Sequence, residues 1–105
     1  MSEAVLEKFV AQLEASHFYE AHESLESYWF PRRFEDDDEI RLLKGFINAA
    51  VSFELLKRGR TEPSLRVWNN YLKYRPILDT LQSEMLGAYR RAAGKIEGMR
   101  IILSS

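Results

Sequence analysis

The amino-acid sequence predicts an all-α fold, a single compact bundle of about five helices around a central apolar helix. Three observations lead to this prediction. The 105 residues are 46% hydrophobic, which is enough for one domain core and leaves little for a second. Only five Gly and three Pro interrupt the chain. Apolar residues recur at steps of three and four and nowhere alternate, so we expect one helical domain over residues 1–105.

Apolar periodicity and helix breakers place the first two helices. Residues 3–15 carry apolar side chains at helical spacing, which predicts one amphipathic helix. Residues 18–30 predict the second helix. Pro31 must end it, because proline disfavours helical geometry in the residue before it and lacks a backbone donor.

The acidic run after Pro31 predicts the start of the third helix, expected over residues 37–58. Carboxylates are favoured at a helix N-terminus, where they can cap unpaired amides and meet the positive end of the dipole. From Phe46 to Leu56 the side chains are apolar on nearly every side of the helix. This pattern predicts that the third helix is surrounded by the others.

Two more helices are expected after Gly59, which can supply the left-handed residue that ends a helix. Thr61 is expected to cap the fourth helix, which runs to about Arg75 before Pro76 breaks it. The fifth, C-terminal helix is expected from Leu81 to residue 103, where apolar residues form a heptad-like seam. We expect the seam to pack on its own bundle, with a homo-oligomer formed through this helix as the alternative.

The charges are divided unevenly although the net charge is only −1. Residues 1–39 carry eleven carboxylates and three Lys or Arg, whereas residues 40–105 carry five carboxylates and twelve Lys or Arg. We expect the two halves to fold against each other and offset these charges, with an anion-binding surface as the alternative. Cations and aromatic residues alternate from Arg66 to Arg75, but aromatic residues at helical spacing favour a core, so we expect no nucleic-acid partner.

The composition also excludes several kinds of site. The chain has no Cys, so disulfides, thiolate metal sites and cysteine nucleophiles are excluded. No apolar run approaches the roughly 20 residues of a membrane span. Residues 1–15 are acidic and amphipathic, unlike a secretory leader. We therefore expect a soluble, cytoplasmic protein with no membrane partner.

Both histidines lie in the segment from His17 to Trp29, together with several carboxylates. At helical spacing His22 shares a side of the helix with apolar residues and with Glu26, so we expect a buried imidazole beside a carboxylate. Glu20 and Glu23 lie on a neighbouring side. Glu26 is close enough to accept the imidazole proton or to share a ligand with it.

The third helix offers a small polar strip formed by Gly45, Asn48 and Ser52. Small residues let another helix approach closely, and a buried amide needs hydrogen-bond partners. We expect the second helix to pack on this strip, so that His22 and a glutamate meet Asn48. The candidate polar network comprises Glu20, His22, Glu23, Glu26, Trp29, Asn48 and Arg58.

Three interpretations of this network remain open. The one that we favour is a buried hydrogen-bond network in a binding, interaction or structural module. The second is a metal or catalytic centre, such as a metal-assisted hydrolase, with His22 as ligand or base and Glu23 or Glu26 as ligand or proton carrier. A divalent metal held by His22 and Glu26 is then the only cofactor that the sequence suggests. The third is a small-molecule or peptide pocket, whose ligand the sequence does not identify.

Familiar catalytic templates do not fit the segment. The zincin pattern requires a second histidine where Glu26 stands. The di-iron carboxylate bundle requires two Glu-x-x-His pairs, and only Glu14 with His17 matches. The sequence therefore assigns no reaction and leaves open whether the protein is an enzyme.

The same segment resembles the family known as domain of unknown function 309. The family's aromatic Glu-Ala-His-Glu segment, followed by Leu-Glu and a tryptophan, stands here as Phe18, Tyr19, Glu20, Ala21, His22, Glu23, Leu25, Glu26 and Trp29. Its downstream blocks are similar to Gly45, Phe46, Ile47, Asn48, Ala49, Ala50 and to Arg58, Gly59, Arg60, with Asn48 and Arg60 departing from the family pattern. The resemblance covers residues 9–81. It implies an all-helical domain and no established activity.

Overall fold

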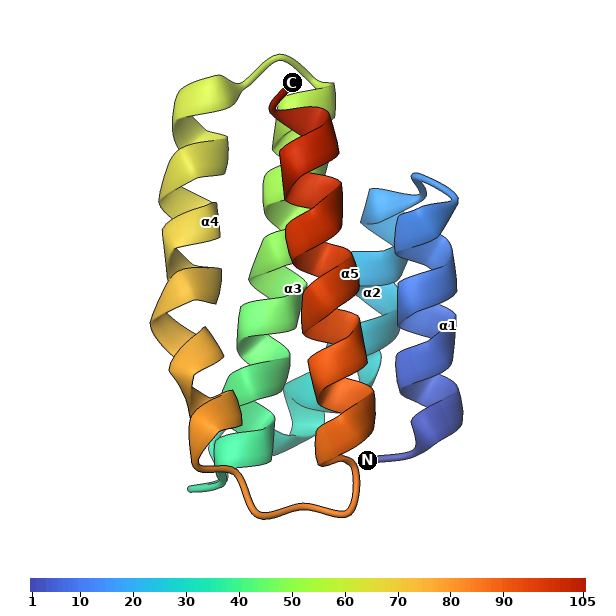
Figure 1. The fold of residues 1–105 in the computed structure, drawn as a ribbon, viewed down its shortest axis with the longest axis vertical. Helices are drawn as coiled ribbons and strands as arrows, with labels where there is room; N and C mark the ends of the chain where they lie inside the picture. The colour runs from blue at the N-terminus through green and yellow to red at the C-terminus, as the bar shows by residue number, and fades with distance from the viewer.

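Five α-helices form the structure, a computed structural model that describes residues 1–105 (Figure 1). The prediction of an all-α fold is confirmed, since no strand is present. None of the five helices has the length and hydropathy that crossing a membrane requires. The helices are α1 (Glu3–Glu14), α2 (Phe18–Trp29), α3 (Asp38–Lys57), α4 (Thr61–Tyr74) and α5 (Leu86–Leu103), and short 3₁₀ turns η1 (Phe30–Arg32) and η2 (Arg75–Asp79) follow α2 and α4.

The central helix is α3, as predicted. Half of its 20 residues are buried, and it packs against α2, α4 and α5 (Figure 1). The ring of Phe46 lies 6.2 Å from that of Phe9 in α1, 6.4 Å from that of Tyr71 in α4 and 6.2 Å from that of Tyr89 in α5, measured between centroids. One α3 side chain therefore joins three other helices in a single cluster of 22 buried apolar residues.

The strip of Gly45, Asn48 and Ser52 faces α4 and not α2, so the predicted partner of the strip is wrong. A Cβ atom at Gly45 would lie 3.0 Å from Cβ of Tyr74, and the Ser64 hydroxyl donates a hydrogen bond to the backbone carbonyl of Ser52 at 2.7 Å. The expected close approach of a second helix is thus present. The short turn between α3 and α4 makes these two helices antiparallel neighbours, and α4 takes the position against the strip.

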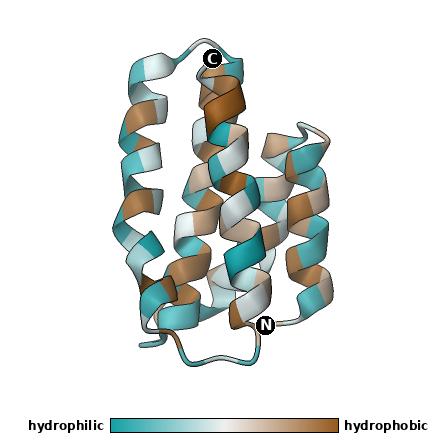
Figure 2. Ribbon diagram, viewed as in Figure 1, coloured by the Kyte–Doolittle hydropathy of each residue, from teal (hydrophilic) through white to brown (hydrophobic).

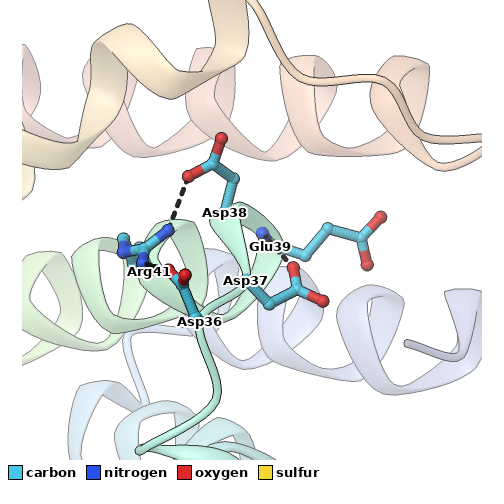
Figure 3. A network of polar contacts seen from close by, with 5 residues as sticks. All are labelled: Asp36, Asp37, Asp38, Glu39 and Arg41. Carbon is cyan, nitrogen blue, oxygen red and sulfur yellow. Dashed lines mark hydrogen bonds and ion pairs between the residues drawn. The ribbon is translucent and has the colours of Figure 1, made fainter.

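The acidic run forms the start of α3, as predicted (Figure 3). The carboxylate of Asp37 accepts a hydrogen bond from the backbone amide of Glu39 at 2.7 Å and so caps the helix. Arg41 forms ion pairs with Asp36 and Asp38. Its hydrogen bonds to Asp36 and Asp38 raise the pKa of the Arg41 guanidinium above its ordinary value.

The turn between α3 and α4 is built around Gly59, as predicted. Gly59 has φ 76°, and the amide of Arg60 bonds back to the carbonyl of Leu55 at 2.8 Å. The expected capping role of Thr61 is wrong, because Thr61 is already the first helical residue and Arg60 is the N-cap without a side-chain bond. The helix starts early since the amides of Gly59 and Arg60 are both used to close α3, which leaves no loop residue before Thr61.

The last helix starts at Leu86 and not at Leu81. The turn η2, which contains Pro76, is followed by a bond from the Leu81 amide to the carbonyl of Ile77 at 2.9 Å, so Leu81 is buried without being helical. The predicted seam does pack on the bundle, since its central members are buried. These members are Tyr89, Ala92 and Ile96.

Tyr71 and Tyr89 are buried core residues whose hydroxyl groups contact carboxylates. The Tyr71 hydroxyl donates to Oε2 of Glu97 at 2.6 Å, and Nε of Arg75 donates to the same oxygen at 2.9 Å. Burial, followed by the contact with Glu97, raises the pKa of Tyr71 far above its ordinary value. Burial and the nearby carboxylate of Glu39 likewise raise the pKa of Tyr89.

The raised pKa values of these two tyrosines lead us to predict that the protein loses stability at alkaline pH. In the unfolded chain tyrosine titrates near pH 10, whereas the raised pKa in the folded state keeps both hydroxyls protonated. The stabilisation is therefore complete below about pH 10 and decreases as the pH rises above it, by up to about 1.4 kcal/mol per pH unit for each tyrosine. In urea unfolding between about pH 9 and about pH 11, the Tyr71→Phe variant should lose stability less steeply than the wild type.

The half-exposed Tyr19 provides the matched control for this measurement. The Tyr19→Phe variant should retain the full alkaline loss of stability, because it leaves the hydroxyls of Tyr71 and Tyr89 in place. An equally steep alkaline loss in the Tyr71→Phe variant would show that the buried hydroxyl is not the cause.

Candidate functional site

The position of the candidate residues follows from which side of α2 is buried. Phe18, Ala21 and Leu25 face the core, and the ring of Phe18 meets that of Phe53 of α3 edge-on at 5.5 Å. Successive helical residues are separated by about 100°, so His22 lies at the edge of this buried side. The His22 side chain is 24% exposed. The expected inward turn of the imidazole is thus incomplete, and the ring reaches the surface.

His22 and Glu26 form the predicted pair. Nε2 of His22 lies 2.5 Å from Oε2 of Glu26, one helical turn further along α2. The imidazole also lies beside the ring of Tyr19, with 5.9 Å between centroids. The pair is local to α2 and requires no other helix, which is why the sequence spacing was sufficient to predict it.

Asn48 is not part of this arrangement, and the predicted contact between His22 and Asn48 is wrong. The Asn48 amide donates to the backbone carbonyl of Lys44 at 2.7 Å and accepts a hydrogen bond from Asn70 of α4 at 3.4 Å. Asn48 lies on the side of α3 that α4 covers. The α3 residues that line a hollow together with His22 are Val51, Glu54, Leu55 and Arg58.

Two surface hollows meet at the imidazole. The first has a volume of about 370 Å³ and is open to solvent along α2. The second, between α2 and α3, has a volume of about 150 Å³. Tyr19 and His22 line both hollows, so the hollows adjoin. We name the residues of the first hollow that carry aromatic or ionisable groups the α2 site: Tyr19, His22, Glu23, Glu26 and Phe30.

The remaining predicted residues are more dispersed. Glu20 lies towards α1, in a hollow with Lys8 and Gln12 that adjoins the first hollow through Glu23 and Ser27. Trp29 is half-buried and packs against the core. Arg58 binds Glu54 at 2.9 Å and lines the second hollow. Sequence reasoning missed Glu54, although the four-residue spacing from Glu54 to Arg58 is a signal that could have identified it.

The α2 site has excess negative charge and exposed aromatic surface. Glu26 is paired with His22, whereas Glu20 and Glu23 have no ion-pair partner. Tyr19 and Phe30 are each 50% exposed. The structure contains no group of three or more His, Asp or Glu side chains placed to hold a metal ion, and His22 with Glu26 supplies two donors. The arrangement suits a cation that also has an apolar part.

A family model described as Domain of unknown function (DUF309) matches residues 6–67. The chain belongs to this family. No curated protein and no solved structure matches the chain. The resemblance predicted for residues 9–81 is therefore confirmed as membership of DUF309, over a range that starts in α1 and ends in α4. The whole α2 site lies inside the DUF309 match, and α5 lies outside it.

Most aromatic residues of the basic half belong to the core of this DUF309 domain. Trp68 is 8% exposed and Tyr71 is fully buried, and their rings stack on each other with 4.7 Å between centroids. Tyr74 packs over Gly45. As the helical spacing predicted, Trp68 and Tyr71 are core side chains.

Proposed function

We propose that this domain is a binding module and that the α2 site receives a positively charged segment of a partner protein. One observation supports the proposal above all. The His22–Glu26 pair lies where two surface hollows meet, beside the half-exposed ring of Tyr19 and next to Glu23, which has no ion-pair partner. An acidic, aromatic surface of this kind complements an apolar segment that carries Lys or Arg.

The chemistry of the first hollow favours a Lys or Arg side chain. A guanidinium or ammonium group can donate hydrogen bonds to the carboxylates of Glu23 and Glu26. It can also lie over the ring of Tyr19 or Phe30, which is worth about 0.5 to 1 kcal/mol at an exposed site. The aliphatic part of a long cationic side chain would cover the same rings.

The second hollow favours an apolar neighbour of this cation. Phe18, Val51 and Leu55 line it, and its volume of about 150 Å³ fits one side chain of moderate size. The charges at its rim, Glu54 and Arg58, already pair with each other. We therefore propose a partner segment in which a basic residue and an apolar residue lie close together on one face.

The other two interpretations receive less support from the geometry. The buried hydrogen-bond network required a contact between His22 and Asn48. Asn48 instead lies on the side of α3 that α4 covers, whereas His22 lies beside the α3 residues that face α2. A metal-assisted hydrolase needs at least a third donor beside His22 and Glu26, since catalytic metal sites are held by about three protein ligands. Binding requires only the exposed rings and carboxylates that the α2 site presents.

The test is a titration of isotope-labelled protein with a short peptide of alternating Arg and Leu, followed by amide chemical shifts. We expect saturable shifts concentrated in residues 18–30 and 51–58. The Glu23→Gln variant should bind about fivefold more weakly, because it removes one exposed, charge-assisted contact of about 1 kcal/mol. Glu23 is exposed and unpaired, so this substitution should leave the fold unchanged.

The acidic run before α3 provides the matched control. The Glu35→Gln variant makes the same change of charge at another exposed position and should bind the peptide as the wild type does. Chemical shifts centred on residues 35–39, or an equal loss of affinity in the two variants, would show nonspecific attraction to acidic surface and would refute the proposal.

A further inference from the structure

We propose that two copies of this chain form a two-fold symmetric dimer through the groove between α1 and α5. The groove has a volume of about 310 Å³ and lies apart from the α2 site. Its floor consists of small and apolar side chains, and charged side chains form both rims. The floor residues are Leu6, Val10, Ala11, Ala88 and Ala92.

The two rims of the groove have opposite charge. On α1 the rim contains only carboxylates, Glu3, Glu7 and Glu14, and on α5 it contains only the cations Arg91 and Lys95. Within the chain a single ion pair spans the groove, from Arg91 to Glu3 at 3.6 Å. Glu7, Glu14 and Lys95 have no ion-pair partner. Most of the charged side chains that line the groove are thus not paired across it, although we expected the acidic and basic halves of the chain to neutralise each other.

A second copy turned by 180° satisfies these charges. The rotation places α1 of each copy against α5 of the other, so the carboxylate rim of one copy faces the cationic rim of its partner twice. A different protein would need one acidic and one basic rim at the same separation. The chain's own α1 and α5 already have that arrangement, which is why we assign the groove to a second copy.

Exposed apolar surface continues the groove beyond the end of α1. In Figure 1, α5 extends past the last turn of α1, and Figure 2 shows that the last turn of α5 is hydrophobic. Ile102 is 68% exposed and lies seven residues after Lys95, hence on the same side of the helix as the groove. Because α1 and α5 run in the same direction, the rotation that sets α1 against the partner's α5 brings the C-terminal ends of the two α5 helices to the same end of the interface, where Ile102 would lie towards the partner copy.

The dimensions of the molecule leave room for an interface of standard size along its long axis. The molecule measures 36 × 24 × 24 Å, so a face along its long axis is comparable with the roughly 800 Å² per partner of a standard interface. Small residues on the floor of the groove let the partner helices approach closely. The interface would combine an apolar centre with charged rims, which is the usual composition of such surfaces.

The test is the molar mass in solution, measured by light scattering and sedimentation equilibrium up to roughly 0.5 mM protein. We expect the wild type to have twice the 12.3 kDa mass of the chain. The Glu7→Lys and Lys95→Glu variants should each dissociate at least about tenfold more readily, because each places like charges opposite one another. An equimolar mixture of the two variants should form the dimer again, since opposite charges then face each other at both contacts.

Two further variants make the result decisive. Glu62→Lys reverses a charge on the exposed surface of α4, where the side chain is 88% exposed, and should leave the dimer intact. Ala11→Arg fills the groove from an exposed position and should give a folded monomer, as verified by circular dichroism. A monomeric wild type, a dimer that survives Ala11→Arg, or a mixture of the charge variants that stays monomeric would each overturn the proposal.

Discussion

Replacing Phe46 with alanine is expected to lower the free energy of unfolding by about 3 to 5 kcal/mol. The Phe46 ring is fully buried and lies among the rings of Phe9, Tyr71 and Tyr89, which belong to three different helices. Truncation would remove apolar contacts with all three helices and leave a cavity that rigid helices cannot fill by small shifts. The melting temperature should fall by at least about 12 °C.

Phe34 is the matched control for this truncation. It is 87% exposed, so Phe34→Ala removes the same atoms from a surface position and should change stability by less than about 0.5 kcal/mol. Urea unfolding of both variants provides the measurement. If Phe46→Ala cost no more than Phe34→Ala, α3 would not be the helix on which the core depends.

The helices were predictable from the sequence because their signals act over one or two turns. Pro31 has no amide hydrogen to continue the hydrogen bonds of α2, and the chain passes into the turn η1 with Phe30 still in helical geometry. Asp37 caps α3 with its own carboxylate, and Gly59 has the positive φ that closes α3. Each effect is decided by residues that are neighbours in the chain. The start of α5 was predicted too early because Leu81 continues the apolar periodicity but lies in a turn. The periodicity shows which residues are buried, and a residue in a turn can be buried as well as one in a helix.

Partners between helices were less predictable than the helices themselves. The sequence showed that α3 has a small strip, but both α2 and α4 have an apolar side that could cover it. The geometry of the short turn at Gly59 decides in favour of α4. For the same reason the His22–Glu26 pair, made within one helix, was predicted correctly, while the contact of His22 with Asn48, made between helices, was not.

The close packing of α3 on α4 leads to the second large prediction, that Gly45→Leu lowers the free energy of unfolding by about 2 to 3 kcal/mol. A Cβ atom at this position would already lie 3.0 Å from Cβ of Tyr74, an atom attached directly to the α4 backbone. The larger leucine would therefore push α4 away from α3 and strain the buried hydrogen bond from Ser64 to Ser52. The higher helix propensity of leucine returns less than about 1 kcal/mol of this loss.

Gly94 separates the effect of packing from that of helix propensity. It lies within α5, and a Cβ atom at this position would meet nothing within 4 Å. Gly94→Leu should therefore raise the free energy of unfolding by up to about 1 kcal/mol, because leucine has the higher helix propensity. Thermal unfolding of the two variants should show opposite shifts, with Gly45→Leu lower by roughly 8 °C or more. If the two variants instead shifted together, the α3–α4 contact at Gly45 would be looser than the 3.0 Å approach to Tyr74 requires.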